Sequence, residues 1–224
     1  MELNLIKTKK IIKSLDALKK HIEICYKKKE DITIDLKELY KRIGTQPKKL
    51  YSIIEYLGSI DVCKNDLKFS VFFPSIPGID FFPLSGKCFH HIYLVGCQIL
   101  ELGIFKNVYS LNISCCYRRV VGEYFDISSL FNVTCLDLSH CGVTSKQISN
   151  MGNKMKYLKV TYFNQMNYAP NSILELTVAS GCYNIDTETT IKTLKNENRR
   201  IKINFGTTYN NYYHEFLCDE FSFL

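Results

Sequence analysis

Apolar residues near the start of the chain recur at helical spacing and then change rhythm. Across Ile11–Tyr26 they fall on one stripe of an amphipathic helix, with lysines on the other faces. The short, alternating and β-branched segment Ile32–Ile34 predicts a brief strand or an extended turn. Asp35, with Glu38 three residues later, forms a capping-box arrangement. This arrangement predicts a second helix over about Leu36–Ile43.

A third helix is predicted to begin near Pro47, because the missing N–H of proline is not needed in a first helical turn. It ends near Gly58, and its inward stripe consists of Leu50, Ile53, Ile54 and Leu57. Ile60–Val62 and Leu67–Phe69 then predict the two strands of a hairpin. Helix, short strand, two helices and a hairpin is the order of a winged helix, whose last helix enters the major groove of DNA.

The predicted third helix resembles a known family. Lys48–Ile60 is similar to the recognition helix of the E2F/DP winged-helix transcription factors, whose signature R-R-x-Y-D-I-x-x-V-L-E-x-I aligns with it without a gap. Asp35-Leu36-Lys37 also resembles the D-L-K that opens the preceding helix in many members. The resemblance covers about residues 11–70. It implies an α+β winged helix that binds double-stranded DNA.

Two departures from the family bear on what this helix would read. Lys48 and Lys49 replace two base-reading arginines, and Ser52 replaces an aspartate. Lysine lacks the bidentate fork of arginine but still contacts guanine or phosphate, so duplex binding is expected rather than the family's GC-rich target. The candidate DNA contacts are Lys48, Lys49, Tyr51, Ser52, Arg42 and Lys64. A winged helix that makes only protein contacts is the alternative.

A second periodicity fills the rest of the chain and follows the leucine-rich-repeat template L-x-x-L-x-L-x-x-N/C-x-L. Two copies match at every apolar or cysteine position: Phe89, Ile92, Leu94, Cys97 and Ile99, then Val133, Leu136, Leu138, Cys141 and Val143. Partial copies begin at Val108, Met155 and Ile173, and a last one contains Ile201 and Ile203. Successive copies begin 18 to 25 residues apart. Five to six repeats in phase predict an α/β solenoid with parallel strands.

Each repeat should supply one strand whose central apolar residues face the core and whose alternating residues lie on a concave face. The cysteine at the ninth position should turn inward and satisfy backbone groups, which accounts for Cys97, Cys116 and Cys141 without disulfides or zinc. The positions expected to bind an unknown protein partner are Tyr93, Asn112, Ser114, Asp137, Ser139, Lys159 and Thr161. They are small, mixed and nearly neutral, which suits a protein better than a nucleic acid.

The predicted organisation is an α+β winged helix followed by an α/β leucine-rich-repeat solenoid. The winged helix occupies residues 1–72, a Pro- and Phe-rich connector 73–85, the repeats 86–206, and a C-terminal cap or tail 207–224. The charge is consistent with this division. The first 70 residues carry 16 basic and 10 acidic side chains, a net of +6 out of +7 for the whole chain. That excess is expected if the first third alone meets a polyanion.

The remaining features narrow the function. The N-terminus lacks the apolar core of a signal peptide, and no apolar run approaches the about 20 residues that span a bilayer, so a nuclear or otherwise intracellular protein is expected. Without a Cys-x2-Cys pair or the motifs of nucleotide-binding and hydrolytic enzymes, we expect no metal, cofactor, small-molecule substrate or catalysis. The first hypothesis is a DNA-binding transcriptional regulator whose repeats bind a protein. The alternative is a non-DNA-binding repeat adaptor or assembly subunit, as in ubiquitin-ligase substrate recognition.

Overall fold

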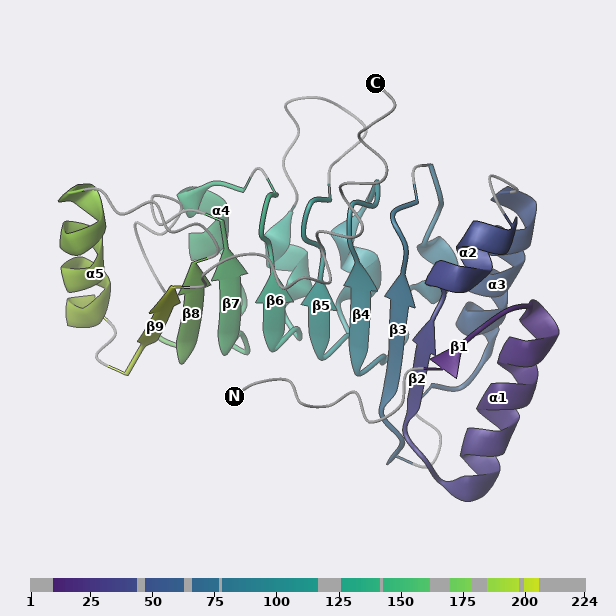
Figure 1. Ribbon diagram of the computed structural model, residues 1–224. Helices are drawn as coiled ribbons and strands as arrows, with labels where there is room; N and C mark the ends of the chain where they lie inside the picture. The colour runs from purple at the N-terminus through teal and green to yellow at the C-terminus, as the bar shows by residue number, and fades with distance from the viewer. Residues whose placement is uncertain are drawn as a thin grey trace.

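The chain forms a row of parallel strands with helices along one side and at both ends (Figure 1). The computed structural model describes residues 10–43, 47–62, 66–76, 78–116, 126–141, 143–161, 170–178, 185–197 and 200–205. Its strands belong to a single nine-stranded sheet in which they follow the order of the chain. All eight pairings between these neighbours are parallel.

Helices alternate with the strands and lie mainly on one side of the sheet. The strands are β1 (Lys10–Ile11), β2 (Ile32–Asp35), β3 (Phe69–Phe73), β4 (His91–Leu94), β5 (Ser110–Asn112), β6 (Cys135–Asp137), β7 (Tyr157–Val160), β8 (Glu175–Val178) and β9 (Lys202–Phe205). The α-helices are α1 (Leu15–Lys28), α2 (Lys37–Ile43), α3 (Pro47–Ser59), α4 (Ser145–Ser149) and α5 (Ile185–Glu197). Three short 3-10 helices are η2 (Phe82–Leu84), η3 (Leu102–Phe105) and η4 (Ile127–Leu130).

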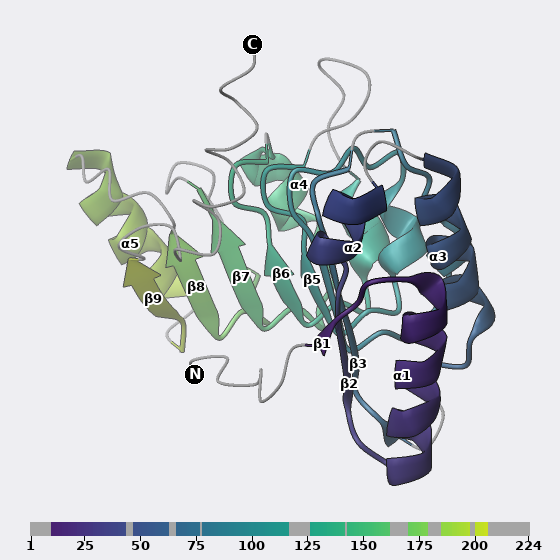
Figure 2. The ribbon, with the colours of Figure 1, turned by 45° about the vertical axis from the view of Figure 1, so that its right-hand side comes forward.

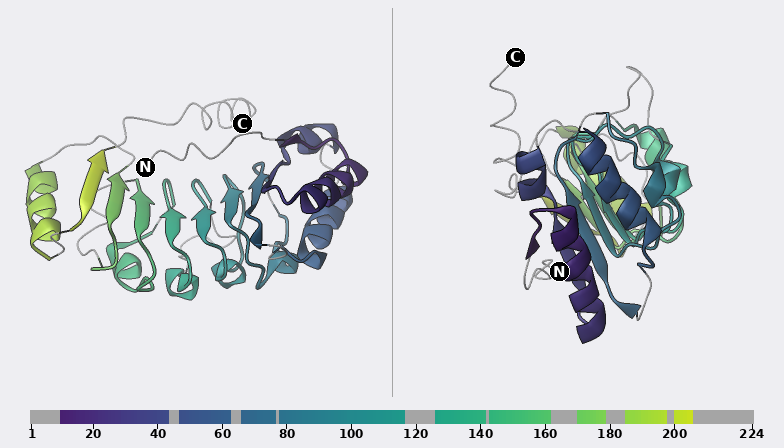
Figure 3. Two further views of the ribbon diagram at one scale, coloured as in Figure 1. Left: turned by 90° about the horizontal axis from the view of Figure 1, so that it is seen from below. Right: turned by 90° about the vertical axis from the view of Figure 1, so that its right-hand side faces the viewer.

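The connections between the strands build a second layer. Parallel strands must be joined by crossovers, and α3, η2, η3, η4 and α4 contact one another in that order. Seen from below, the 3-10 helices and α4 lie on one side of the strands (Figure 3). We call the other side of β2–β9, which these helices leave uncovered, the open face. The α/β arrangement that the repeat pattern predicts is therefore present, and its strands occupy the predicted positions.

The strand register stacks the core side chains in rows. Val71, Ile92, Leu111, Leu136, Leu158 and Leu176 are aligned across β3–β8 and are all buried. One apolar cluster runs from Ile12 to Ile201 with no break between the N-terminal third and the repeats. Each strand with its connection covers the core of its neighbours, so the aligned rows bury apolar surface that a single strand could not bury alone.

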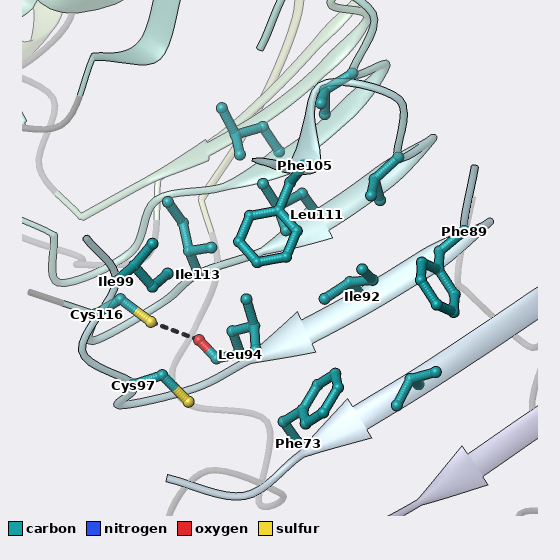
Figure 4. Packing of buried hydrophobic residues seen from close by; sticks show 14 of the residues in the cluster. Phe73, Phe89, Ile92, Leu94, Cys97, Ile99, Phe105, Leu111, Ile113 and Cys116 are labelled. Carbon is teal, nitrogen blue, oxygen red and sulfur yellow. Dashed lines mark hydrogen bonds between the residues drawn. The ribbon is translucent and has the colours of Figure 1, made fainter. Parts of the chain in front are cut away.

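Three cysteines link successive units, as the repeat template predicts. Each thiol donates to a backbone carbonyl of the preceding unit, and Figure 4 shows the middle one of these bonds. The three bonds are Cys97 Sγ to Pro74 O (3.3 Å), Cys116 Sγ to Leu94 O (2.6 Å) and Cys141 Sγ to Ile113 O (2.9 Å). Burial raises the pKa of the Cys141 thiol to about 12. The thiol therefore stays protonated, and its S–H remains able to donate the hydrogen bond. The predicted structural role of these cysteines is confirmed.

The first helix begins later than its apolar stripe predicts. Ser14 is the N-cap of α1, and its Oγ accepts a hydrogen bond from Ala17 N at 3.1 Å, while Ile11 belongs to β1. Serine is favoured at this position because its side chain satisfies an N–H that has no partner within the helix. The start predicted at Ile11 is therefore wrong. The predicted strand β2 and helices α2 and α3 are confirmed.

The strands of the N-terminal third differ from those of a winged helix. The hairpin predicted from Ile60–Val62 and Leu67–Phe69 is wrong, because the first segment forms no strand and Phe69 begins β3. β3 pairs in parallel with β2 on one side and β4 on the other. This pairing buries Val71 and both ends of β3, Phe69 and Phe73, in the same core as the repeats. A division into two units at residue 72 remains a prediction, which the continuous sheet does not favour.

Gly58 lets α3 lie directly against η2. A Cβ at this position would lie 2.1 Å from the carbonyl oxygen of Pro83 and 2.8 Å from its carbonyl carbon. Helix propensity alone would favour alanine by about 1 kcal/mol. The backbone of Pro83 cannot rotate away, so we expect Gly58→Ala to lower the free energy of unfolding by about 1–3 kcal/mol in urea denaturation. Ser59→Ala, at the exposed end of the same helix, should change it by less than about 0.5 kcal/mol. A Gly58→Ala protein more stable than wild type would contradict this packing.

Candidate functional site

The open face presents two rows of side chains that the strand register aligns. Side chains alternate along a strand, so the residues between the core positions point to this face. The first row is Thr33, Ser70, His91, Ser110, Cys135, Tyr157, Glu175 and Lys202. The second row is Asp35, Phe72, Tyr93, Asn112, Asp137, Lys159, Thr177 and Asn204. Only the second row contains residues that the repeat template singled out.

A hollow of about 170 Å³ lies across the middle of both rows. Its lining includes Tyr93, Ser110, Asn112, Cys135, Asp137, Tyr157, Lys159, Glu175 and Thr177. The residues of the first row in this lining were missed by the sequence analysis. The template specifies only the apolar positions, but extending the alternation one residue toward the start of each strand would have found Ser110, Cys135, Tyr157 and Glu175.

A polar network fixes the side chains at the centre of the hollow. Asp137 Oδ2 lies 3.2 Å from Lys159 Nζ and accepts a hydrogen bond of 3.2 Å from Asn112 Nδ2. Asp137 Oδ1 accepts a further bond, of 2.9 Å, from Ser139 N. Asn112 Oδ1 in turn accepts from the backbone N and the Oγ of Ser114, at 2.9 and 2.8 Å. The carboxylate of Asp137 is therefore held in one position before any ligand arrives.

Four of the predicted partner contacts are buried. Asn112, Ser114, Ser139 and Thr161 are each less than a tenth exposed, so the prediction that they are accessible is wrong. The strands end at Asn112 and Asp137, and the residues that follow belong to the turns. Two of the four accept from a backbone N–H: Asn112 Oδ1 from Ser114 N at 2.9 Å, and Thr161 Oγ1 from His140 N. The accessible predicted contacts are Tyr93, Asp137 and Lys159.

Two aromatic pairs lie on or just before β3–β5, and one of their rings, Tyr93, lines the hollow. The rings of Phe72 and Tyr93 are stacked, with centroids 4.0 Å apart, and those of His90 and Tyr109 are stacked at 4.8 Å. Burial, together with the nearby Cys135 and Asp137, raises the pKa of Tyr93 to about 12. The Tyr93 hydroxyl therefore remains a hydrogen-bond donor at any pH near neutrality.

His91 is the least satisfied polar side chain of the first row. It is 7 % exposed, and neither ring nitrogen has a hydrogen-bond partner. Burial, and then the charges of His90 and Lys68, lower the pKa of His91 to about 4. A histidine in the unfolded chain has a pKa of about 6.5. Below pH 6.5 the unfolded state therefore binds a proton that the folded state does not bind, and stability should fall as the pH drops toward 4.

We expect His91→Phe to remove both the unpaired buried nitrogens and the loss of stability toward low pH. The variant loses two unpaired buried nitrogens and should gain about 1–3 kcal/mol of stability at neutral pH. Its advantage over wild type should widen between about pH 6.5 and pH 4, by at most about 1.4 kcal/mol per pH unit. Urea denaturation at several pH values measures both quantities. Parallel curves for wild type and His91→Phe would contradict the burial of this imidazole.

The thiol in the hollow is poorly suited to covalent chemistry. Burial raises the pKa of Cys135 to about 11, although hydrogen bonds with Tyr109 and Ser110 act in the opposite direction. A protonated thiol is a weak nucleophile. Within the described ranges, no three His, Cys, Asp or Glu side chains gather as a metal-ligand set. Every helix in that part of the chain is too short or too polar to cross a lipid bilayer.

The predicted DNA contacts that the structure describes lie on α3, at the N-terminal end of the row of strands (Figure 2). Lys48, Lys49, Tyr51 and Ser52 are all exposed on the first half of α3, where Ser52 Oγ donates to Lys48 O at 3.0 Å. The structure thus brings four of the six predicted contacts together. The side chain of Arg42, all of Lys64 and the predicted cap or tail at 207–224 lie outside the described residues.

No family model and no curated protein matches the sequence. The functional interpretation therefore depends on the geometry of the open face and of α3.

Proposed function

We propose that this protein is a leucine-rich-repeat interaction module that binds a protein partner on its open face. The observation that carries the proposal is the hollow between β4 and β8, with the fixed Asp137–Lys159 pair at its centre. Repeat arrays of this kind bind partners on the extended surface that their strands form. The cysteine bonds between units support the assignment to this class of repeat.

The chemistry of the hollow suits a protein surface. Asp137 and Glu175 balance Lys159 and the neighbouring Lys202, so this face carries no excess of positive charge to attract a polyanion. Tyrosine, here Tyr93 and Tyr157, is enriched at protein interfaces because it combines a large apolar surface with a hydroxyl. The proposal includes no catalytic step.

Site-specific photo-crosslinking in cells that express the protein tests the proposal. A benzophenone amino acid in place of Tyr157 on the open face should yield a discrete protein adduct, whereas the same group in place of Phe131, which is exposed beside η4, should not. Lys159→Glu should abolish the adduct, because the new carboxylate repels Asp137 and reverses the central charge. Identical adducts from positions 157 and 131, or an adduct indifferent to Lys159→Glu, would exclude the open face as the binding surface.

A second candidate function is binding of duplex DNA through α3, as the E2F/DP resemblance implies. The observation that favours it is the joint exposure of Lys48, Lys49, Tyr51 and Ser52 on one surface of that helix. A DNA-binding regulator of this kind would act in the nucleus. The open face would then recruit a protein to the bound duplex.

Replacing Lys48 and Lys49 together by alanine tests this candidate in the full chain. If both ammonium groups meet phosphates, the slope of log affinity against log salt should flatten by about one unit per lost contact. A lysine that reads guanine should also narrow the preference for one duplex over random DNA, by about 1–3 kcal/mol. Lys192 and Lys195, exposed on α5 at the opposite end, provide the matched control pair. Equal binding and an equal slope in the α3 double variant would exclude this helix as the DNA-reading element.

A further inference from the structure

A second hollow lies away from the open face, between the turns that lead into η2 and η3. It measures about 240 Å³, which exceeds the about 150 Å³ of a cavity known to admit benzene. Its floor is formed by the buried side chains of Ile79, Phe81, Ile99 and Ile104. We call it the η2–η3 hollow.

The two most exposed large apolar side chains in the described part of the chain flank this hollow. Phe82 is 64 % exposed and Leu100 is 53 % exposed, and both belong to its lining. Large apolar side chains that stand in water beside an apolar hollow mark interaction sites more often than scattered single ones do. An incoming apolar side chain would cover both of them and fill the space between.

The rim of the hollow is acidic. Asp80 and Glu101 are exposed members of the lining, and neither forms an ion pair with a cation in the described ranges. The whole chain, in contrast, carries a net charge of +7. Two carboxylates beside an apolar floor complement an apolar side chain with basic neighbours.

The hollow is built on rigid turns. Asp80 Oδ1 accepts a hydrogen bond of 2.8 Å from Phe82 N. The backbone of Pro83, in the same turn, packs closely against Gly58 of α3. Phe81 is held in the floor by ring contacts with Phe73, at a centroid distance of 5.3 Å, and with Phe105, at 6.2 Å. A preformed site of this kind loses little conformational freedom when it binds.

We infer that the η2–η3 hollow docks a segment of a partner protein that inserts one large apolar side chain between Phe82 and Leu100. Lysine or arginine residues that flank this side chain in the partner meet Asp80 and Glu101. None of its lining residues lines the hollow of the open face, so this docking site is distinct from the one of the proposed function.

Amide chemical-shift titrations of the full chain with three defined peptides test the inference. Acetyl-Lys-Leu-Lys-amide should shift the amides of residues 79–82 and 99–104. Acetyl-Glu-Leu-Glu-amide should bind at least about threefold more weakly, as expected for two exposed charge pairs. Acetyl-Lys-Ala-Lys-amide should produce no saturable shift. Equal affinities for the first two peptides, or shifts spread over the surface, would overturn the inference.

Matched variants test whether the peptide binds at the η2–η3 hollow. Phe82→Ser should abolish binding of the Lys-Leu-Lys peptide, whereas Phe131→Ser, at an exposed phenylalanine outside the hollow, should leave it unchanged. Glu101→Lys leaves Asp80 opposed by one lysine, so it should abolish the preference for the Lys-Leu-Lys peptide over the Glu-Leu-Glu peptide. Because these side chains are exposed, the variants should fold, which thermal unfolding checks. Binding that survives Phe82→Ser would overturn the inference.

Two other occupants would give distinct results. Self-association of the full chain that is lost in Phe82→Ser would assign the hollow to a second copy of this protein. Tighter peptide binding after deletion of residues 1–9, which contain leucine and isoleucine beside lysine, would assign it to the chain's own N-terminus. Either result would overturn the inference of a partner protein.

Discussion

A fragment that ends at Ser75 is expected not to fold cooperatively. Such a fragment retains all the residues of the predicted winged helix, but it loses the parallel ladder that joins Ser70–Phe73 of β3 to β4. It also loses η2, against which α3 packs, and the edge-to-face contact of Phe69 with Phe89 at 5.4 Å. A parallel strand stripped of its neighbour leaves its backbone groups and one edge of the core in water.

Circular dichroism across a urea gradient measures this result. The fragment should show a broad, non-sigmoidal change, whereas a chain shortened to residues 1–161, which keeps β1–β7, should still unfold in one transition. The shortened chain should have a smaller m-value than the full chain because it exposes less surface on unfolding. A sigmoidal transition in the fragment ending at Ser75 would establish an autonomous N-terminal domain, as the E2F/DP resemblance implies.

Leu138→Ala should cost about 2–5 kcal/mol of stability, the range of buried leucine truncations. Leu138 is fully buried just after β6, and its backbone N donates to Lys159 O at 2.8 Å. Its side chain belongs to the continuous core, and β6 has a neighbouring strand on each side, which limits collapse around the cavity. Leu174→Ala is the matched control because Leu174 is 41 % exposed, and it should cost less than about 0.5 kcal/mol. Equal costs for the two variants in urea denaturation would contradict the placement of Leu138.

Local pattern was sufficient to predict the repeat strands. In β4, β6 and β7 the apolar template positions fall on the buried residues, because a strand with one face in the core has inward side chains at a spacing of two. The ninth-position cysteines were also predictable, since their role depends on a turn that every unit repeats. In the N-terminal third, helix positions could be predicted because helices are closed by local hydrogen bonds.

Strand partners could not be predicted in the same way. Helix, strand, two helices and strand fits a winged helix and also the first units of a solenoid, and the difference lies in whether β3 pairs with a hairpin strand or with β4. That pairing joins residues 21 positions apart, as in Ser70↔His91, and leaves no local mark on the sequence of residues 60–73. The exposure of Ser114, Ser139 and Thr161 was mispredicted for a related reason. Alternation holds only while a strand lasts, and these residues lie just past the strand ends.

The order of the strands has a kinetic consequence. From β3 to β9 each strand pairs only with units next to it in the chain, and paired residues are 18 to 27 positions apart, as in Tyr157↔Glu175 and Glu175↔Lys202. Contacts of such short range close small loops, and closing a small loop costs less entropy than closing a large one. Folding can therefore nucleate at any interior unit and spread in both directions.

At the N-terminal end of the sheet, the paired residues lie further apart in the sequence. β2 and β3 are joined through α2 and α3, and their paired residues Ile32 and Phe69 are 37 positions apart. This is the longest closure in the described sheet. The end of the array that carries the exposed lysines of α3 should therefore assemble last, on a template that the central units have already formed.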